Sequence, residues 1–310
     1  MRKKLVIATR GSQLALWQAN AVKDSFGALD SSLKVSLEII LTTGDIIQDV
    51  PLARVGGKGI FVKEIEEEIL DGRADLAVHS VKDVPVFLPD GLTLACVPAR
   101  EDCRDAFLSV SHAGVADLPP GAKVGTSSLR RQAQLLALRP DLRVVPLRGN
   151  VDTRLRKLLE GAYDAIIMAA AALRRLHLDA PVVTFFDADS FLPAVGQGAL
   201  GIECRADDSE LSDFLKKLED RPSRLCVEAE RGLLAGLDGG CQVPVACHAR
   251  LSDENTLHLK ALVAETDGSR ILREKKSGPA AAARALGLQL ADTLLGNGAR
   301  EILERLTGAQ

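Results

Sequence analysis

The chain has 310 residues, of which 46% are hydrophobic, 26% charged and 3% aromatic, and its formal net charge is −3. This length exceeds what one small core needs and predicts two or three domains of a globular protein. The near-neutral charge gives no global basic field for nucleic acid or a membrane surface. No apolar run approaches the roughly 18 residues of a membrane span.

The six cysteines are scattered, without a CxxC pair or a spacing typical of a metal site. The apolar run after the basic N-terminus is too short for a signal peptide. Cysteines in a chain without an export signal are typical of a reducing compartment. We therefore expect free thiols, no metal, no membrane partner and a cytoplasmic location.

Two runs of alternating strands and helices follow one another along the chain. Because such alternation builds βαβ units, each run predicts a mostly parallel, doubly wound lobe. The first run predicts strands at 5–9, 33–42, 74–79 and 92–97, with helices after the N-cap Ser12 and over 60–70. The second predicts strands at 106–110, 124–125, 142–147 and 165–170, with helices over 128–138 and 151–159.

The apolar, glycine-bearing segment 190–205 is expected to lead the chain back into the first sheet. The pattern after residue 220 predicts a small α+β domain, with helices over 222–237, 279–295 and 299–306 and strands at 245–251, 257–263 and 271–274. Ligands bind at the carboxyl ends of strands in α/β lobes of this kind, which predicts a cleft there. The expected domains are residues 1–99 with 199–219, residues 100–198, and residues 220–310.

Cys241 lies in the sequence GGCQVP, residues 239–244, at the start of the third expected domain. The two glycines allow close approach to the backbone, and Pro244 prevents the turn from continuing as a helix. A cysteine in such a turn is more often inert than reactive. An anion-binding cleft in the same chain would instead favour a covalently held acidic ligand.

Arginine is concentrated between residues 126 and 175, a segment with ten basic residues and only four acidic ones. The segments 125–128 and 147–150 each end a strand and open a helix, where free backbone N–H groups bind anions. Guanidinium groups at such positions are typical of carboxylate or phosphate recognition, but the nucleotide motifs GxGxxG and GxxxxGK[ST] are absent. We expect a solvated surface for four of these cations, Arg139, Arg143, Arg156 and Lys157.

The sequence HSVKDVP directly follows the predicted strand at 74–79, so Asp83 falls near that strand's carboxyl end. An acid beside a lysine is usually a surface pair worth under about 1 kcal/mol. Among arginines, however, Asp83 would stay ionised and could stabilise a developing cation. We expect His79 in the core or behind the site. The glycine-rich segment with Arg54 and Lys58 is either a surface loop or a lid.

Five motifs in this order, HSVKDVP, GTSSLRR, LRGNVDTRL, PAVGQGALGIECR and GGCQVP, resemble the porphobilinogen deaminase (hydroxymethylbilane synthase) family. The resemblance runs from residue 7 to residue 306 and implies two periplasmic-binding-protein-like lobes with a small C-terminal domain. It implies a monomeric transferase of tetrapyrrole biosynthesis that joins four porphobilinogen molecules, releases ammonia at each step and frees hydroxymethylbilane by hydrolysis. It also implies a dipyrromethane primer bonded as a thioether to Cys241.

The resemblance assigns catalysis to Asp83, whose carboxylate would stabilise the cation left by departing ammonia and help to move protons. It implies cofactor contacts from Ser80, Lys82, Asp83, Thr126, Ser128, Arg130, Arg131 and Gly149. It implies substrate contacts from Arg10, Ser12, Gln18, Arg54, Lys58, Ser127, Arg148, Asn150, Arg154, Arg175 and Gln197. Two positions depart from the family pattern: Arg54 replaces a usual lysine, and His177 occupies a site expected to be smaller.

Two other functions stay open at this stage. An anion-binding protein without catalysis would need only the cleft, and it gives Cys241 no role. A nucleic-acid binder using residues 130–156 would need steep salt dependence and aromatic stacking platforms, whereas this chain has one Trp and one Tyr.

Overall fold

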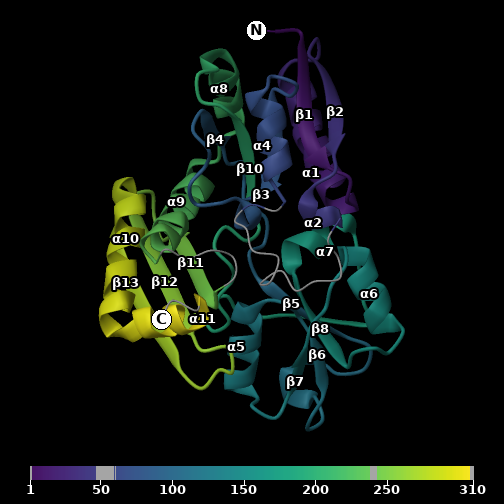
Figure 1. Cartoon of the computed structure of the whole chain (residues 1–310), viewed down its shortest axis with the longest axis vertical. Helices are drawn as coiled ribbons and strands as arrows, with labels where there is room; N and C mark the ends of the chain where they lie inside the picture. Colours follow the sequence, from purple (N-terminus) through teal and green to yellow (C-terminus); the bar gives the residue numbers. More distant parts are fainter. Residues whose placement is uncertain (1, 47–58, 60, 238–242, 308–310) are drawn as a thin grey trace. The chain divides into compact units, whose positions relative to one another are not determined.

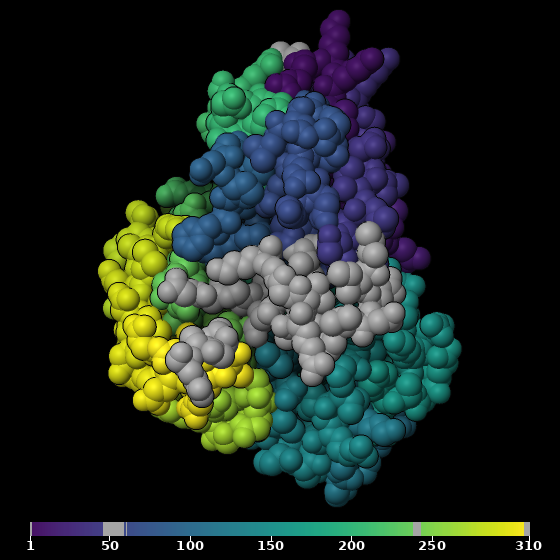
Figure 2. Space-filling model, in the orientation of Figure 1, coloured from purple at the N-terminus to yellow at the C-terminus, as the bar shows by residue number. Residues whose placement is uncertain are grey.

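The computed structural model describes residues 2–46, 59, 61–237 and 243–307. Figure 1 and Figure 2 draw the other residues in grey. The chain forms two compact units, Met1–Glu101 with Ala199–Arg224 and Asp102–Gly198 with Leu225–Gln310. The predicted partition into three domains stays a prediction. None of the described helices has the length and apolar character that a membrane crossing requires.

The first unit is built on a five-stranded sheet of order β2-β1-β3-β10-β4. Strand β1 pairs in parallel with β2 and β3, and β10 pairs antiparallel with β3 and β4. The one antiparallel strand is therefore the one that returns from the second unit, as predicted for 190–205. The strands are β1 (Lys4–Arg10), β2 (Lys34–Ile40), β3 (Leu76–Ser80), β4 (Leu92–Cys96) and β10 (Leu200–Arg205).

Helices cover both faces of this sheet. One face packs against α1 and α8 through a core that includes Ile7, Phe26 and Phe214, and the Phe26 and Phe214 ring centroids lie 5.4 Å apart. The other face packs Ala77 against Ile65 of α4. The helices are α1 (Gln13–Leu29), α2 (Thr43–Ile46), α4 (Lys63–Leu70) and α8 (Ser209–Leu215). Ser12 caps α1 as predicted, because its hydroxyl accepts a hydrogen bond from Ala15 N at 3.3 Å.

The second unit begins with a sheet of order β7-β6-β8-β5-β9. Strand β6 is parallel to β7 and β8, whereas β5, which enters from the first unit, is antiparallel to β8 and β9. The strands are β5 (Asp105–Ser109), β6 (Lys123–Gly125), β7 (Arg143–Val145), β8 (Ala165–Ala169) and β9 (Val182–Phe185). The helices are α5 (Leu129–Leu138), α6 (Val151–Leu159) and α7 (Ala170–Leu176).

The same unit contains an antiparallel meander of β11 (Val245–Leu251), β12 (Thr256–Ala264) and β13 (Ile271–Pro279). Helices α9 (Arg221–Gly236), α10 (Ala283–Leu294) and α11 (Arg300–Thr307) share one core with this sheet. On the sheet's other face, Leu262 packs against Ala133 of α5. These elements confirm the predicted class, two α/β lobes with a small C-terminal α+β part.

The segment that leaves the second unit is held by a buried carboxylate of α9. Glu230, with none of its surface exposed, accepts hydrogen bonds from Gly196 N at 2.7 Å and Ala249 N at 2.9 Å. This carboxylate joins the returning segment to β11 within the second unit.

Candidate active site

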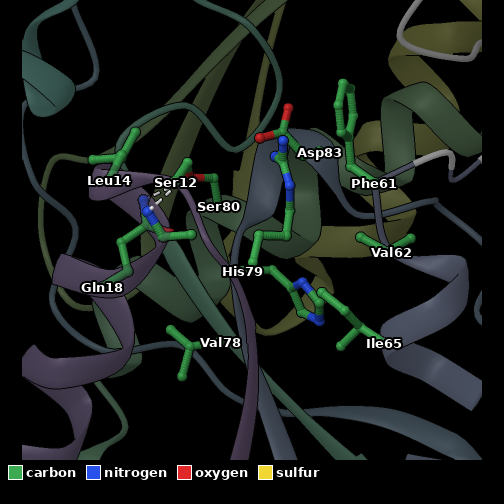
Figure 3. A pocket seen from close by; sticks show the side chains of 12 residues that line it. Ser12, Leu14, Gln18, Phe61, Val62, Ile65, Val78, His79, Ser80 and Asp83 are labelled. Carbon is green, nitrogen blue, oxygen red and sulfur yellow. Dashed lines mark hydrogen bonds between the residues drawn. The ribbon is translucent and has the colours of Figure 1, made fainter. Parts of the chain in front are cut away.

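A pocket opens in the first unit where β1 and β3 end, at the expected sheet edge (Figure 3). In this view Asp83 and Phe61 lie on the upper side, and Val78, His79 and Ile65 lie on the lower side. Strand ends and the first turn of α1 supply most of its polar side chains. Of the predicted site residues, the pocket gathers Arg10, Ser12, Gln18, Ser80 and Asp83.

Asp83 closes a short 3-10 turn, Val81–Asp83, directly after β3. The backbone N–H of Val84 bonds to the carbonyl of Val81 and ends this turn. Asp83 is exposed, and its carboxylate makes no hydrogen bond or ion pair with any described residue. The turn therefore presents an uncommitted carboxylate at the pocket, while Lys82 beside it is half-buried.

Arg10, at the end of β1, is oriented by an acid that the sequence analysis did not identify. Its Nε donates to Asp45 Oδ2 at 3.1 Å, its Nη2 donates to Asp45 Oδ1, and the guanidinium lies 4.3 Å from the Phe61 ring centroid. Burial disfavours the Asp45 charge, but the bonds from Arg10 and Thr42 outweigh burial and hold the pKa of Asp45 below its ordinary value. Nη1 of Arg10 makes no bond to a described residue and is available for an anion.

Four hydroxyl groups of the predicted site share one hydrogen-bonding pattern. Each accepts a bond from the protein, and none donates its own proton to a described residue. A carboxylate can only accept, so such hydroxyl protons match an acidic ligand. The bonds are Ala15 N to Ser12 (3.3 Å), Gln18 Nε2 to Ser80 (2.9 Å), Ser128 N to Thr126 (3.2 Å) and Arg131 N to Ser128 (3.4 Å).

In the second unit, the loops after β6 and β7 lie side by side. Thr126 N donates to Val145 O at 3.0 Å. The Ser127 hydroxyl accepts from Leu147 N at 3.1 Å and donates to Leu147 O at 3.0 Å. The Ser127 hydroxyl therefore donates its proton within the protein, unlike the hydroxyls of Thr126 and Ser128. Its two hydrogen bonds link the two predicted anion-binding loops.

The loop before α6 needs a glycine. Gly149 has φ +108°, and an added Cβ would lie 2.7 Å from Thr153 Cγ2. Asn150 occupies the N-cap position of α6 as expected, but its side chain makes no capping hydrogen bond. Arg154 Nε donates to Gly149 O at 2.7 Å, and Arg148 precedes this turn as a half-buried side chain.

Arg130 and Arg131 do not lack a neutralising acid, contrary to the expectation from their neighbourhood in the sequence. Asp105, fully buried at the start of β5, binds Arg130 Nη1 at 2.6 Å and Arg131 Nη2 at 2.7 Å. Arg131 also donates to Ile167 O, so all three of its nitrogens bond inside the unit. Burial opposes the Asp105 charge, but the two arginines outweigh it and hold the pKa of Asp105 well below its usual range.

Two predicted substrate contacts hold the returning segment of the second unit. Arg175, 6% exposed, donates to Gly198 O at 2.7 Å. Gln197, 1% exposed, donates to Cys103 O at 2.7 Å and to Asp105 Oδ1 at 3.0 Å. Three other predicted site residues, Arg54, Lys58 and Cys241, lie outside the described residues.

Two family models match the chain. The one described as "Porphobilinogen deaminase, dipyromethane cofactor binding domain" matches residues 5–213, and the C-terminal domain model matches residues 224–296. The porphobilinogen deaminase of Nitratidesulfovibrio vulgaris (strain Miyazaki F) is 60% identical over 99% of this chain and 98% of its own. That of Lawsonia intracellularis is 54% identical over 97% of each chain.

This chain belongs to the porphobilinogen deaminase family. The enzyme is a transferase of tetrapyrrole biosynthesis that condenses porphobilinogen, with loss of ammonia, and carries a dipyrromethane cofactor. Family membership agrees with the donor chemistry of the site. Hydroxyl protons and guanidinium groups collect where each lobe's strands end, and both porphobilinogen and dipyrromethane bear carboxylates.

Proposed function

We propose that Asp83 is the catalytic carboxylate of the condensation. One observation carries the proposal: the turn after β3 exposes the Asp83 carboxylate at the pocket with no described partner, beside the hydroxyl groups of Ser12 and Ser80. A carboxylate that no described cation pairs with is available to a ligand. It can therefore face positive charge that develops on a bound pyrrole.

The chemistry matches that placement. When the aminomethyl C–N bond of porphobilinogen breaks, ammonia leaves and positive charge spreads over the substrate pyrrole. A new C–C bond then forms, and the attacking pyrrole carbon loses its proton, which balances the proton carried away as ammonium. Asp83 stabilises the cation and assists this proton movement. When bound, the dipyrromethane supplies the pyrrole from which the chain grows.

The remaining predicted residues divide into direct and supporting groups. The free protons of the four hydroxyl groups named above, and Nη1 of Arg10, fit direct contacts with substrate or cofactor carboxylates. We propose the same direct role for four residues in the turns after β3 and β7 and at the start of α6: Lys82, Arg148, Asn150 and Arg154. Four predicted contacts make hydrogen bonds within their own unit, and we propose that they hold the loops in place. These are Ser127, Arg131, Arg175 and Gln197.

We further propose Cys241 as the thioether anchor of the dipyrromethane, with four porphobilinogen molecules joined per hydroxymethylbilane released. A monomeric, cytoplasmic enzyme is also proposed. The five described cysteines are free thiols, which agrees with a reducing compartment.

Intact-mass measurement of the purified enzyme tests the anchor. Wild type made in cells that synthesise porphobilinogen should exceed its sequence mass by two pyrrole units, and Cys241→Ser should lack this addition. Cys103→Ser, a half-buried thiol elsewhere in the chain, is the matched control and should keep it. An addition that persists in Cys241→Ser, or an unmodified wild type, would refute the anchor.

A further inference from the structure

Behind the pocket, a histidine and a glutamate from neighbouring strands form a buried pair. In the antiparallel β3–β10 ladder, His79 lies opposite Gly201 and Ala77 lies opposite Glu203. Residues two apart on a strand share a face, so His79 and Glu203 project to the same side of the sheet. His79 Nε2 lies 2.9 Å from Glu203 Oε2, and the two residues are 6% and 0% exposed.

A second carboxylate covers this pair. Helix α4 packs on the same face through Ile65 and Ala77 and brings in Glu66, which is 5% exposed. The charges that act on Glu66 come from Glu203 of β10, His79 of β3 and Glu67 of its own helix. Burial, with repulsion from Glu203, raises the pKa of Glu66 to about 7.

The hydrogen bonds of this cluster are incomplete. Glu66 Oε1 and Glu203 Oε1 are buried and have no hydrogen-bond partner among the described residues. The single His79 ring can offset at most one carboxylate charge, and an uncompensated buried charge is costly. A proton on one of the carboxyl groups removes one buried charge. The burial of two unpartnered carboxyl oxygens therefore favours a proton on Glu66 or Glu203.

The cluster also reaches the pocket. His79 lines the same pocket as Ser80 and Asp83 and lies on its lower side in Figure 3. Its Nε2 faces Glu203, while Nδ1 makes no hydrogen bond to a described residue. The His79 ring thus connects the two buried carboxylates with the wall of the pocket.

We propose that Glu66, His79 and Glu203 form a buried triad that holds one exchangeable proton and sets the charge behind the Asp83 pocket. This proposal rests on that pocket being the site of condensation, with His79 as a positioning residue. Loss of the proton adds one negative charge to the triad. That charge repels the carboxylates of an acidic substrate, so proton loss raises KM. It does not oppose the positive charge that develops on the bound pyrrole, so kcat is unchanged.

Glu66→Gln is the test, because it keeps the size of the side chain and cannot ionise. We expect the wild-type KM for porphobilinogen to rise about three- to tenfold between about pH 6 and pH 8, and the variant's KM to stay nearly level. Glu38→Gln, an exposed glutamate on β2 of the same sheet that does not act on Glu66, is the matched control and should keep the rise. Equal pH profiles of KM in wild type and Glu66→Gln would overturn the proposal.

A readout independent of turnover separates this proposal from the role of Asp83. Carboxyl-carbon NMR of protein labelled at glutamate follows Glu66 directly, and Glu66→Gln assigns its signal. The Glu66 carboxyl should titrate near pH 7 in wild type and in Asp83→Asn. A Glu66 signal that titrates at the ordinary value of a glutamate would overturn the triad even if Asp83 proved catalytic.

Discussion

The side-chain amide of Gln18 in α1 donates a hydrogen bond to the Ser80 hydroxyl at the end of β3, at 2.9 Å. Gln18 is 3% exposed, so solvent barely competes for this bond. Because the amide occupies the oxygen's acceptor side, it turns the Ser80 proton away from α1. A residue of the first helix thereby orients a donor at the Asp83 pocket.

Gln18→Met removes this bond and keeps much of the side-chain volume. We expect kcat/KM to fall about fivefold, the equivalent of one net hydrogen bond of about 1 kcal/mol, through a higher KM. Ser80→Ala should cause a similar loss, and the double variant should add little to either single change. Fully additive losses would show that Gln18 acts independently of Ser80. Asn20→Ala, on the exposed side of the helix, is the control.

Asp105→Asn should destabilise the second unit strongly. It leaves Arg130 and Arg131 buried without their shared anion, and breaking a buried pair costs about 3–5 kcal/mol. Denaturant unfolding measures the loss. Asp141→Asn, which breaks the exposed Arg139–Asp141 pair, should cost far less, because solvent screens an exposed pair. Equal losses from the two variants would contradict the structural role of Asp105.

Glu66 should make stability depend on pH in a direction opposite to most carboxyl groups. Its pKa rises from 4.5 to about 7 on folding, so the folded state binds the proton more tightly. Stability should therefore fall as pH rises from about 4.5 to about 7, by a total of the order of 3 kcal/mol. Thermal unfolding across this range should show the fall in wild type and in Glu38→Gln, an exposed glutamate that does not act on Glu66. A fall that persists unchanged in Glu66→Gln would contradict the assignment.

His177→Gly should stabilise the enzyme. His177 ends α7 with φ 50° and ψ 41°, and it is the only non-glycine residue with positive φ in the described part of the chain. Relief of this left-handed conformation should contribute about 1 kcal/mol, less the added freedom of glycine in the unfolded chain. A rise in melting temperature checks this, with His177→Asn intermediate. A lower melting temperature would show that the His177 side chain contributes contacts of its own.

The sequence predicted best the features that depend on neighbouring residues. Ser12 caps its helix as expected, because capping is a local pattern. The strand predicted at 165–170 matches β8, but helix α7 was not predicted, since residues 165–173 are continuously apolar and no glycine or proline marks the change. Strand β13 extends to Pro279 beyond the predicted 271–274. In the part that was missed, exposed residues alternate with half-buried ones, because β13 is an edge strand with one face towards solvent. That part has few apolar residues from which a strand could be predicted.

Partners distant in the sequence could not be predicted in this way. Asp105 precedes Arg130 by 25 residues and belongs to another strand, so counting acids near the arginines missed it. Glu203 is 124 residues from His79, and only the β3–β10 register brings them together. Local patterns therefore predict polar and basic residues at strand ends, but they cannot show which arginines are paired inside the fold.

Asp83→Asn tests the central claim most directly, because the amide keeps the shape of the side chain and removes its charge. Steady-state turnover of porphobilinogen and intact mass are measured on the same purified sample. We expect turnover to fall at least about 100-fold, while the mass still shows the two-pyrrole addition or stalled longer chains. Near-normal turnover by Asp83→Asn carrying that addition would contradict the catalytic role of the Asp83 carboxylate.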